Sequence, residues 1–175
     1  MATRWHRDIR ARYGVDADGL NGLLAEFLEI LTSFLPAILG PSREEVDPLW
    51  MQACELFGAT AARRGLAAGE VIEEFQILRE AVIRLLYRDP PLGSDGRLSL
   101  RDALRLNRAI DRGVTHASVG HTDALFYALF EGSGIPDRPG TELLSEIRLQ
   151  IQDLRAELQE IQDRRERRRR GDGAG

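Results

Sequence analysis

Apolar residues recur every three to four positions along most of this chain, and stretches that alternate apolar and polar residues are nearly absent. A spacing near 3.6 residues places the apolar positions on one face of an α-helix, whereas a half-buried strand shows a period of two. The pattern therefore predicts an all-α fold, namely a helical bundle of four main helices followed by a C-terminal coiled-coil helix.

Glycine, proline and capping residues delimit the four bundle helices. We predict helices at 17–39, from Ser42 to about Gly65, at 70–87, and from about Ser99 to Glu131. Ser42 and Glu45 have the spacing of a capping box, in which hydroxyl and carboxylate bond first-turn amide groups. The inward residues expected in the first three helices are Leu20, Leu23, Leu24, Phe27, Leu31, Phe34, Leu35 and Ile38, then Val46, Trp50, Ala53, Phe57 and Ala61, then Val71, Phe75, Leu78, Val82 and Leu85.

The C-terminal stretch "LLSEIRLQIQDLRAELQEIQDRRERRRR" has the heptad pattern of a coiled coil. The a positions are Leu144, Ile151 and Leu158, and the d positions are Ile147, Leu154 and Ile161. In a parallel homodimer, the e-position residues Arg148 and Arg155 would face g positions of the second helix. Alternatively, the helix folds back and buries the same seam against its own bundle.

These boundaries give the following organisation: a sensory or input bundle at 1–131, a linker at 132–140, a coiled-coil stalk with an Arg-rich end at 141–170, and a disordered tail at 171–175. The linker "GSGIPDRPG" is rich in glycine and proline, which interrupt helices. The N-terminal stretch "TRWHRDIRARYG" is expected to form a short helix that covers one end of the bundle.

Charge is distributed unevenly along the 175 residues. The net charge is −4, but 164–170 holds six Arg and one Glu, so this end carries +5 and the remainder −9. The basic tail consists of Arg164, Arg165, Arg167, Arg168, Arg169 and Arg170. Such a tail can complement the helix dipole, keep the chain soluble, dock a partner, or neutralise phosphates of nucleic acid or lipid.

Several classes of site are unsupported by the sequence. Cys54 is the only cysteine, which excludes an intramolecular disulfide and a cysteine-based zinc site and fits a reducing cytoplasm. His116 and His121 are five residues apart, which is not the spacing of two metal ligands on one helix face. We expect no cofactor, no metal, no transmembrane segment and no catalytic motif.

The fourth helix carries a column of polar residues on what the sequence indicates is its apolar stripe. Within about 60° of Asn107 lie the polar residues Asp111, Ser118 and His121 and the apolar residues Leu104, Ile110, Val114 and Leu125. Two interpretations stay open. Asn107 and Asp111 could satisfy buried partners such as Arg79 on the third helix, or the column could line a pocket that holds a small ligand or responds to pH through His121.

The end of the fourth helix, "ALFYALF", is apolar on all sides. Phe126, Tyr127 and Phe130 are expected to point away from the core, so they need cover from elsewhere. Either the N-terminal segment around Trp5 or a second subunit can supply that cover.

Two segments carry a resemblance to a known family: "FGATAARRGLAAGEVIEEFQILREAVI" from Phe57 and "LNRAIDRGV" from Leu106. The matching residues are Gly58, Arg63, Gly65, Glu74, Phe75, Leu78, Arg79, Asn107, Ile110 and Asp111. The chain resembles the helical N-terminal sensory domain of RsbRD-type stressosome co-antagonists, which is similar to a domain that precedes the catalytic core of some bacterial histidine kinases.

The resemblance implies a non-catalytic input module that forms dimers or larger assemblies and passes a signal to an output domain. Because no STAS domain or kinase core follows, the output would be a separate partner such as a kinase or a STAS-type protein. We therefore predict a cytoplasmic, bacterial signalling module that dimerises and relays a signal through its coiled coil. A small nucleic-acid-associated protein is the alternative, and an enzyme that uses the polar column is a third possibility.

Overall fold

A computed structural model of the chain describes residues 20–88, 99–130 and 141–172. These residues form five helices and contain no strand, which confirms the all-α prediction. The helices are α2 (Leu20–Leu39), α3 (Arg43–Arg63), α4 (Ala68–Arg88), α5 (Leu100–Phe130) and α6 (Thr141–Asp172). The predictions for the N-terminal segment, the linker at 132–140 and the last residues of the tail lie outside the described residues.

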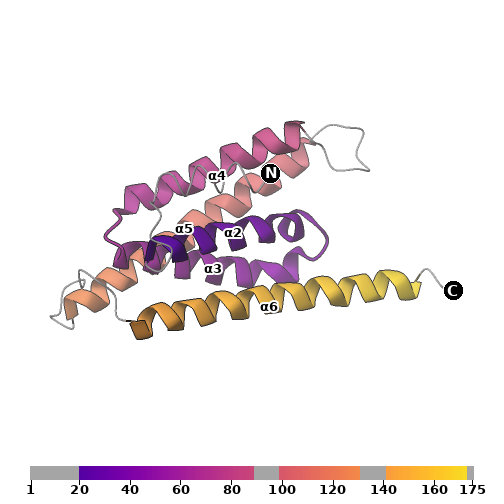
Figure 1. Cartoon of the computed structure of the whole chain (residues 1–175). Coiled ribbons are helices and arrows are strands. Elements are labelled where there is room, and N and C mark those ends of the chain that lie inside the picture. The colour runs from indigo at the N-terminus through magenta and orange to yellow at the C-terminus, as the bar shows by residue number, and fades with distance from the viewer. Residues whose placement is uncertain (1–19, 89–98, 131–140, 173–175) are drawn as a thin grey trace.

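Figure 1 shows α4 lying along α5, α2 beside α3, and α6 extending along the opposite side of the bundle. Consecutive helices of the bundle run in opposite directions, so α3 and α5 run the same way. The residue numbers of contacting partners rise together along α3 and α5, from Asp47 with Arg112 to Leu66 with His121, as expected for parallel helices. None of the five described helices has the length and apolarity of a membrane span.

An aromatic cluster fills the core between α2, α3 and α4. Phe57 and Phe75 meet edge to face with ring centroids 5.7 Å apart, and Trp50 touches both Phe34 and Phe75 in the same way. The Trp50 indole N–H donates a hydrogen bond to the Ala109 carbonyl over 2.9 Å, so its one polar group is satisfied in the interior. The inward residues predicted for the first three helices are all buried wherever their side chains are described.

Helices α3 and α5 approach so closely that their backbones touch at two glycines. A Cβ atom placed on Gly58 would lie 1.8 Å from the Ala117 carbonyl oxygen, and one on Gly120 would lie 2.0 Å from the Glu55 carbonyl oxygen. Such distances are far inside van der Waals contact, so only glycine fits at these positions. The close crossing of α3 and α5 therefore depends on glycine, which has no side chain, at positions 58 and 120.

The buried face of α5 differs from the predicted one. It is formed by Leu106, Ala109, Ile110, Gly113, Ala117, Gly120 and His121. Of the residues that the prediction placed on the stripe, Ile110 and His121 are buried and Val114 is half-buried, but Leu104 and Leu125 are 49% and 36% exposed. The true face is rotated by roughly 100°, about one residue step, because small residues facing α3 allow close packing while adding little apolar character.

Helix starts also correct one local prediction. Ser42 precedes α3 with φ −84° and ψ 10°, and its hydroxyl makes no capping hydrogen bond, so the predicted capping box is not formed. In contrast, the predicted cap at the start of α5 is confirmed, because the Asp102 N–H donates to the Ser99 hydroxyl over 3.1 Å. The Ser42 hydroxyl is thus left for another role.

Helix α6 packs lengthwise against α2 and α3 and buries its heptad seam there. Five of the six predicted seam residues, Ile147, Ile151, Leu154, Leu158 and Ile161, are buried and at most 6% exposed, and Leu144 is half-buried. The e-position residues pair with α2 instead of a second helix: Arg148 lies 3.9 Å from Glu26, and Arg155 lies 3.6 Å from Glu29. This arrangement is the fold-back alternative, and pairing of the seam with a second subunit stays a prediction.

Apolar burial, not charge, holds α6 in place. Burying an Ile or Leu side chain contributes about 1.5–3 kcal/mol, whereas a partly exposed ion pair contributes about 0–1 kcal/mol. The five seam residues therefore outweigh the two ion pairs, which instead help to select the register of α6 on α2.

Replacing Gly58 with Ala should destabilise the protein strongly, because the added methyl group meets the backbone of α5 and the helices must separate. We expect a loss of more than about 3 kcal/mol in urea denaturation. The control is Gly69→Ala at an exposed position of α4 with open space around it, where the change should range from zero to a gain of about 1 kcal/mol. Equal effects of the two substitutions would contradict the close approach of α3 and α5.

Candidate functional site

The structure brings together two of the five polar residues that the sequence analysis singled out. The Arg79 guanidinium on α4 donates a hydrogen bond to the Asp111 carboxylate on α5, which confirms the predicted pairing across these helices. However, the side chains of Arg79 and Asp111 are 32% and 64% exposed, so the pair lies at the rim of the interface. Screening by water makes it weaker than the buried pair that was expected.

The other three polar residues do not join this pair. The Ser118 hydroxyl donates to the Val114 carbonyl of its own helix over 2.8 Å. His121 is buried, and its Nε2 donates to the Leu66 carbonyl, 2.8 Å away, in the connection between α3 and α4. Asn107 is half-buried. These contacts tie the column to local backbone groups, so a shared pocket along α5 stays a prediction.

Two polar contacts between α3 and α5 were not foreseen from the sequence. Arg112 lies 2.7 Å from Asp47, and the Glu55 carboxylate accepts a hydrogen bond from Nδ1 of His116 over 2.6 Å. Arg112 and His116 are four residues apart and Asp47 and Glu55 are eight apart, so each pair shares one helix face. The matching spacing of opposite charges on the two helices could have indicated these contacts. The sequence does not show that α3 and α5 are neighbours, so the partners could not be matched.

Cys54 lies in the core and is fully buried as a free thiol. Burial raises its pKa well above the usual value, and the nearby Glu55 carboxylate raises it further. The thiol is therefore protonated at neutral pH and inaccessible, which excludes it as a nucleophile.

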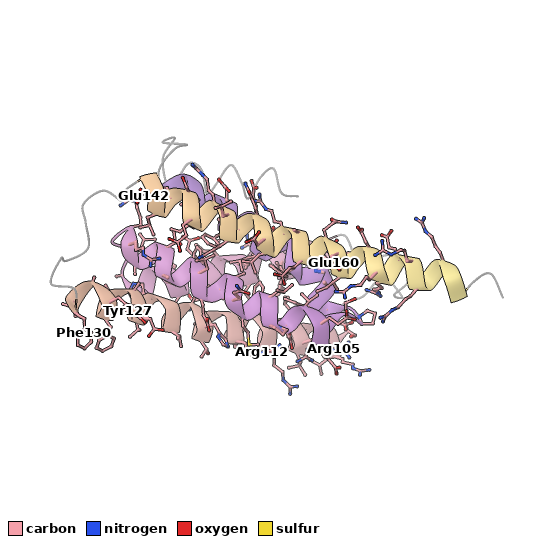
Figure 2. All side chains as sticks on the ribbon, turned by 90° about the horizontal axis from the view of Figure 1, so that it is seen from below. Arg105, Arg112, Tyr127, Phe130, Glu142 and Glu160 are labelled. Atoms are coloured by element: carbon pink, nitrogen blue, oxygen red, sulfur yellow. The ribbon has the colours of Figure 1, made fainter. Side chains whose placement is uncertain are left out.

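The C-terminal end of α5 carries the largest exposed apolar side chains that the structure describes. Phe126 is 56% exposed, Tyr127 71%, Leu129 75% and Phe130 86%, and the rings of Phe126 and Phe130 stack with centroids 6.5 Å apart. Figure 2 shows Tyr127 and Phe130 at the end of α5, away from the packed helices. This aromatic patch has no cover among the described residues, so the predicted outward direction of these rings is confirmed.

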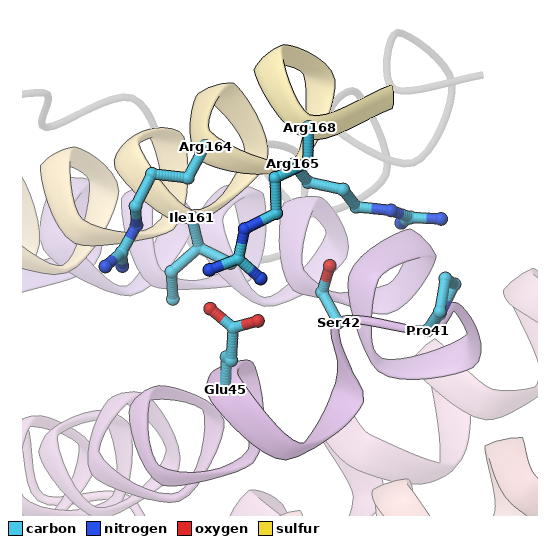
Figure 3. A pocket seen from close by; sticks show the side chains of 7 residues that line it. All are labelled: Pro41, Ser42, Glu45, Ile161, Arg164, Arg165 and Arg168. Atoms are coloured by element: carbon cyan, nitrogen blue, oxygen red, sulfur yellow. The ribbon is translucent and has the colours of Figure 1, made fainter. Parts of the chain in front are cut away.

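The basic tail is divided between solvent and the bundle. Arg164 and Arg170 lie 4.0 and 3.8 Å from Glu160 and Glu166, one turn earlier on the same helix. Arg165 and Arg168, together with Arg164, line a hollow where α6 passes the start of α3 (Figure 3). The side chain of Arg167 is exposed, and that of Arg169 lies outside the described residues. One face of the tail is thus directed toward the protein itself.

Within the described residues, ion pairs join α4 to α5 and α5 to α3, and the aromatic patch lies exposed at the end of α5. The model of one protein family, the RsbT co-antagonist protein rsbRD N-terminal domain, matches residues 1–128. The chain belongs to this family, which places it among stressosome-related signalling domains. No curated protein and no solved structure gives a match. Helix α6 lies beyond the matched residues.

The exposure of Arg79 and Asp111 leads to a prediction about their coupling. In a double-mutant cycle of Arg79→Ala and Asp111→Ala, unfolded by urea, we expect a coupling energy of about 0.2–1 kcal/mol, as for other partly exposed ion pairs. The coupling should decrease with added salt, because exposed charges are screened. A coupling above about 3 kcal/mol, typical of buried pairs, would show that the pair is shielded from water.

Proposed function

We propose that this chain is a non-catalytic input module of bacterial signal transduction that acts in the cytoplasm, forms a homodimer through the aromatic patch of α5, and relays its state to a separate partner protein through α6. The aromatic patch is the observation that carries the proposal. Membership of a family described as a co-antagonist domain supports action through protein contacts rather than catalysis.

The size of the aromatic patch supports a weak dimer. Phe and Tyr side chains each offer about 150–250 Å², so the exposed fractions of Phe126, Tyr127 and Phe130 amount to about 400 Å² per subunit. A patch of this size is comparable to functional patches on monomeric proteins but only about half of a standard interface. A second copy of the same apolar surface is self-complementary under two-fold symmetry, which favours a homodimer at micromolar concentrations or above.

Helix α6 is suited to transmit a change in the bundle because it contacts two of the bundle helices along its length. Its seam is apolar, its e-position arginines reach acidic residues of α2, and its end reaches the start of α3. A shift of α2 relative to α3 would alter the surface on which α6 rests. The partner would then detect α6 as docked or released.

Nucleic-acid binding through the basic tail remains the second candidate. Of the six arginines, three line the hollow beside α3, and two lie near glutamates one turn away. Only Arg167 has a described, exposed side chain without such a neighbour. The partial involvement of the tail with its own protein is the reason for ranking this function second.

The homodimer can be tested by light scattering after size exclusion at 10–100 µM protein, a range chosen because a small interface of this kind dissociates at about micromolar concentrations. We expect a concentration-dependent mass that approaches a dimer, and the double variant Phe126→Ser with Phe130→Ser should remain monomeric with an unchanged melting temperature. The control is Leu149→Ser, because Leu149 is 60% exposed on the outer side of α6 and is not part of the patch. A monomeric wild-type protein throughout this range would reject the dimer.

The relay through α6 predicts a different response to substitutions in the seam. Ile151→Asp with Leu154→Asp places two carboxylates in an apolar interface, so α6 should detach while the bundle stays folded. Hydrogen exchange should then become fast in α6 and remain slow around Trp50, and the dimer mass should not change. Loss of the dimer at an intact bundle would instead indicate that the seam, not the aromatic patch, joins the subunits.

A further inference from the structure

A hollow of about 160 Å³ lies where α6 crosses the start of α3. Its lining consists of Pro41, Ser42, Glu45, Ile161, Arg164, Arg165 and Arg168. A second, neighbouring hollow shares Ser42 and Arg165 with the first. Figure 3 shows the Ser42 hydroxyl pointing toward the arginines, with the Arg165 guanidinium above Glu45. Two elements that are distant in sequence thus place polar groups around one small space.

Ser42 is the least expected member of this lining. It is only 5% exposed, and its hydroxyl neither caps α3 nor forms another hydrogen bond to a described residue. Hydroxyl groups at such positions nearly always have a hydrogen-bond partner, which can be protein, water or a ligand. Because this hydroxyl is directed into the hollow, the hollow is the natural place for its partner.

The remaining lining groups indicate that the partner is an anion. The first-turn amides of α3 have no intrahelical acceptor, and the positive end of the helix dipole lies at the same point. Among the described residues, no ion pair satisfies Arg168 or the half-buried Arg165, and Arg164 has only a neighbour 4.0 Å away. Three arginines but only one carboxylate, that of Glu45, line the hollow, which leaves an excess of positive charge there.

We propose that this hollow is a binding site for the phosphate group of a small phosphomonoester. Arg165 and Arg168 supply charge-assisted hydrogen bonds, the Ser42 hydroxyl donates to one phosphate oxygen, and the start of α3 supplies backbone amides. The volume corresponds to about five water molecules at ~30 Å³ each, enough for a tetrahedral group of five heavy atoms. The rest of the ligand extends into solvent, because the hollow is partly open to the surface.

A phosphate in this position would connect α3 to the C-terminal part of α6. Binding of phosphate would stabilise the docked position of α6, because the site is complete only when α6 lies against the bundle. The ligand would therefore favour docked over released α6. This inference does not require the homodimer, and failure of the dimer test would leave it intact.

The test is calorimetric titration of the full chain with inorganic phosphate and with phenyl phosphate at constant ionic strength. We expect saturable binding of one ligand per chain for both compounds. The double variant Arg165→Gln with Arg168→Gln should weaken binding at least about tenfold, and Ser42→Ala should weaken it by a smaller factor. The control variant Arg167→Gln removes the same charge from the same helix outside the hollow and should bind as the wild type does.

Glu45→Gln provides an independent check, since it does not remove a proposed ligand. The Glu45 carboxylate repels an anion in the hollow, so its neutralisation should tighten phosphate binding by up to about fivefold. Weaker binding in this variant, an absence of saturation, or equal losses in Arg167→Gln and Arg165→Gln would overturn the proposal. Tight, salt-sensitive binding of duplex DNA that depends on Arg167 would also overturn it, in favour of a nucleic-acid surface.

Discussion

The direct contact between the backbones of α3 and α5 determines how the rest of the bundle is arranged. With Gly58 against Ala117 and Gly120 against Glu55, the two helix axes come closer than ordinary side chains would allow. Trp50 can then reach the Ala109 carbonyl, and Phe75 of α4 packs beside Gly113. Helix α4 covers this crossing from one side, and α2 places Phe27 and Phe34 against α3. Each of these contacts assumes the short distance that the two glycines permit.

The polar contacts around this crossing lie at its rim and align the helices more than they stabilise them. Arg79 with Asp111 joins α4 to α5, and Arg112 with Asp47 joins α5 to α3. All of these side chains retain some exposure to water, so each pair adds about 1 kcal/mol or less. Because a wrong rotation of α5 would separate these pairs, their value lies in selecting one orientation among several that bury similar apolar area.

The fold was predictable where large apolar residues define the buried face, and the prediction was wrong where small residues do. In α2, α3 and α4 the stripes contain Phe, Trp, Leu and Val, whose hydrophobicity gives a clear period. The inner face of α5 contains Ala109, Gly113, Ala117 and Gly120. These small residues give no clear hydrophobic period, and their role becomes visible only when the close approach of α3 is known. The pairing of Arg79 with Asp111 was still predicted correctly, because a long arginine reaches the edge of an interface from a range of helix rotations. The polar pairs Arg112–Asp47 and His116–Glu55, and the hollow at Ser42, depend on which helices meet, and a single sequence does not encode that directly.

Helix α6 shows why a heptad pattern alone does not identify its partner. The pattern requires an apolar groove of helical shape, and both a second helix and the groove between α2 and α3 meet this requirement. Attachment to the same chain gives α6 an effective concentration of about millimolar near its own bundle, whereas a second subunit must compete from solution. About three heptads bind too weakly to overcome that advantage, and the pairs of Arg148 with Glu26 and Arg155 with Glu29 add to it. The seam can therefore pair with a second subunit only after the packing of α6 on its own bundle has been weakened. A ligand that bridges α6 and α3 at Ser42 would strengthen that packing and so oppose such pairing.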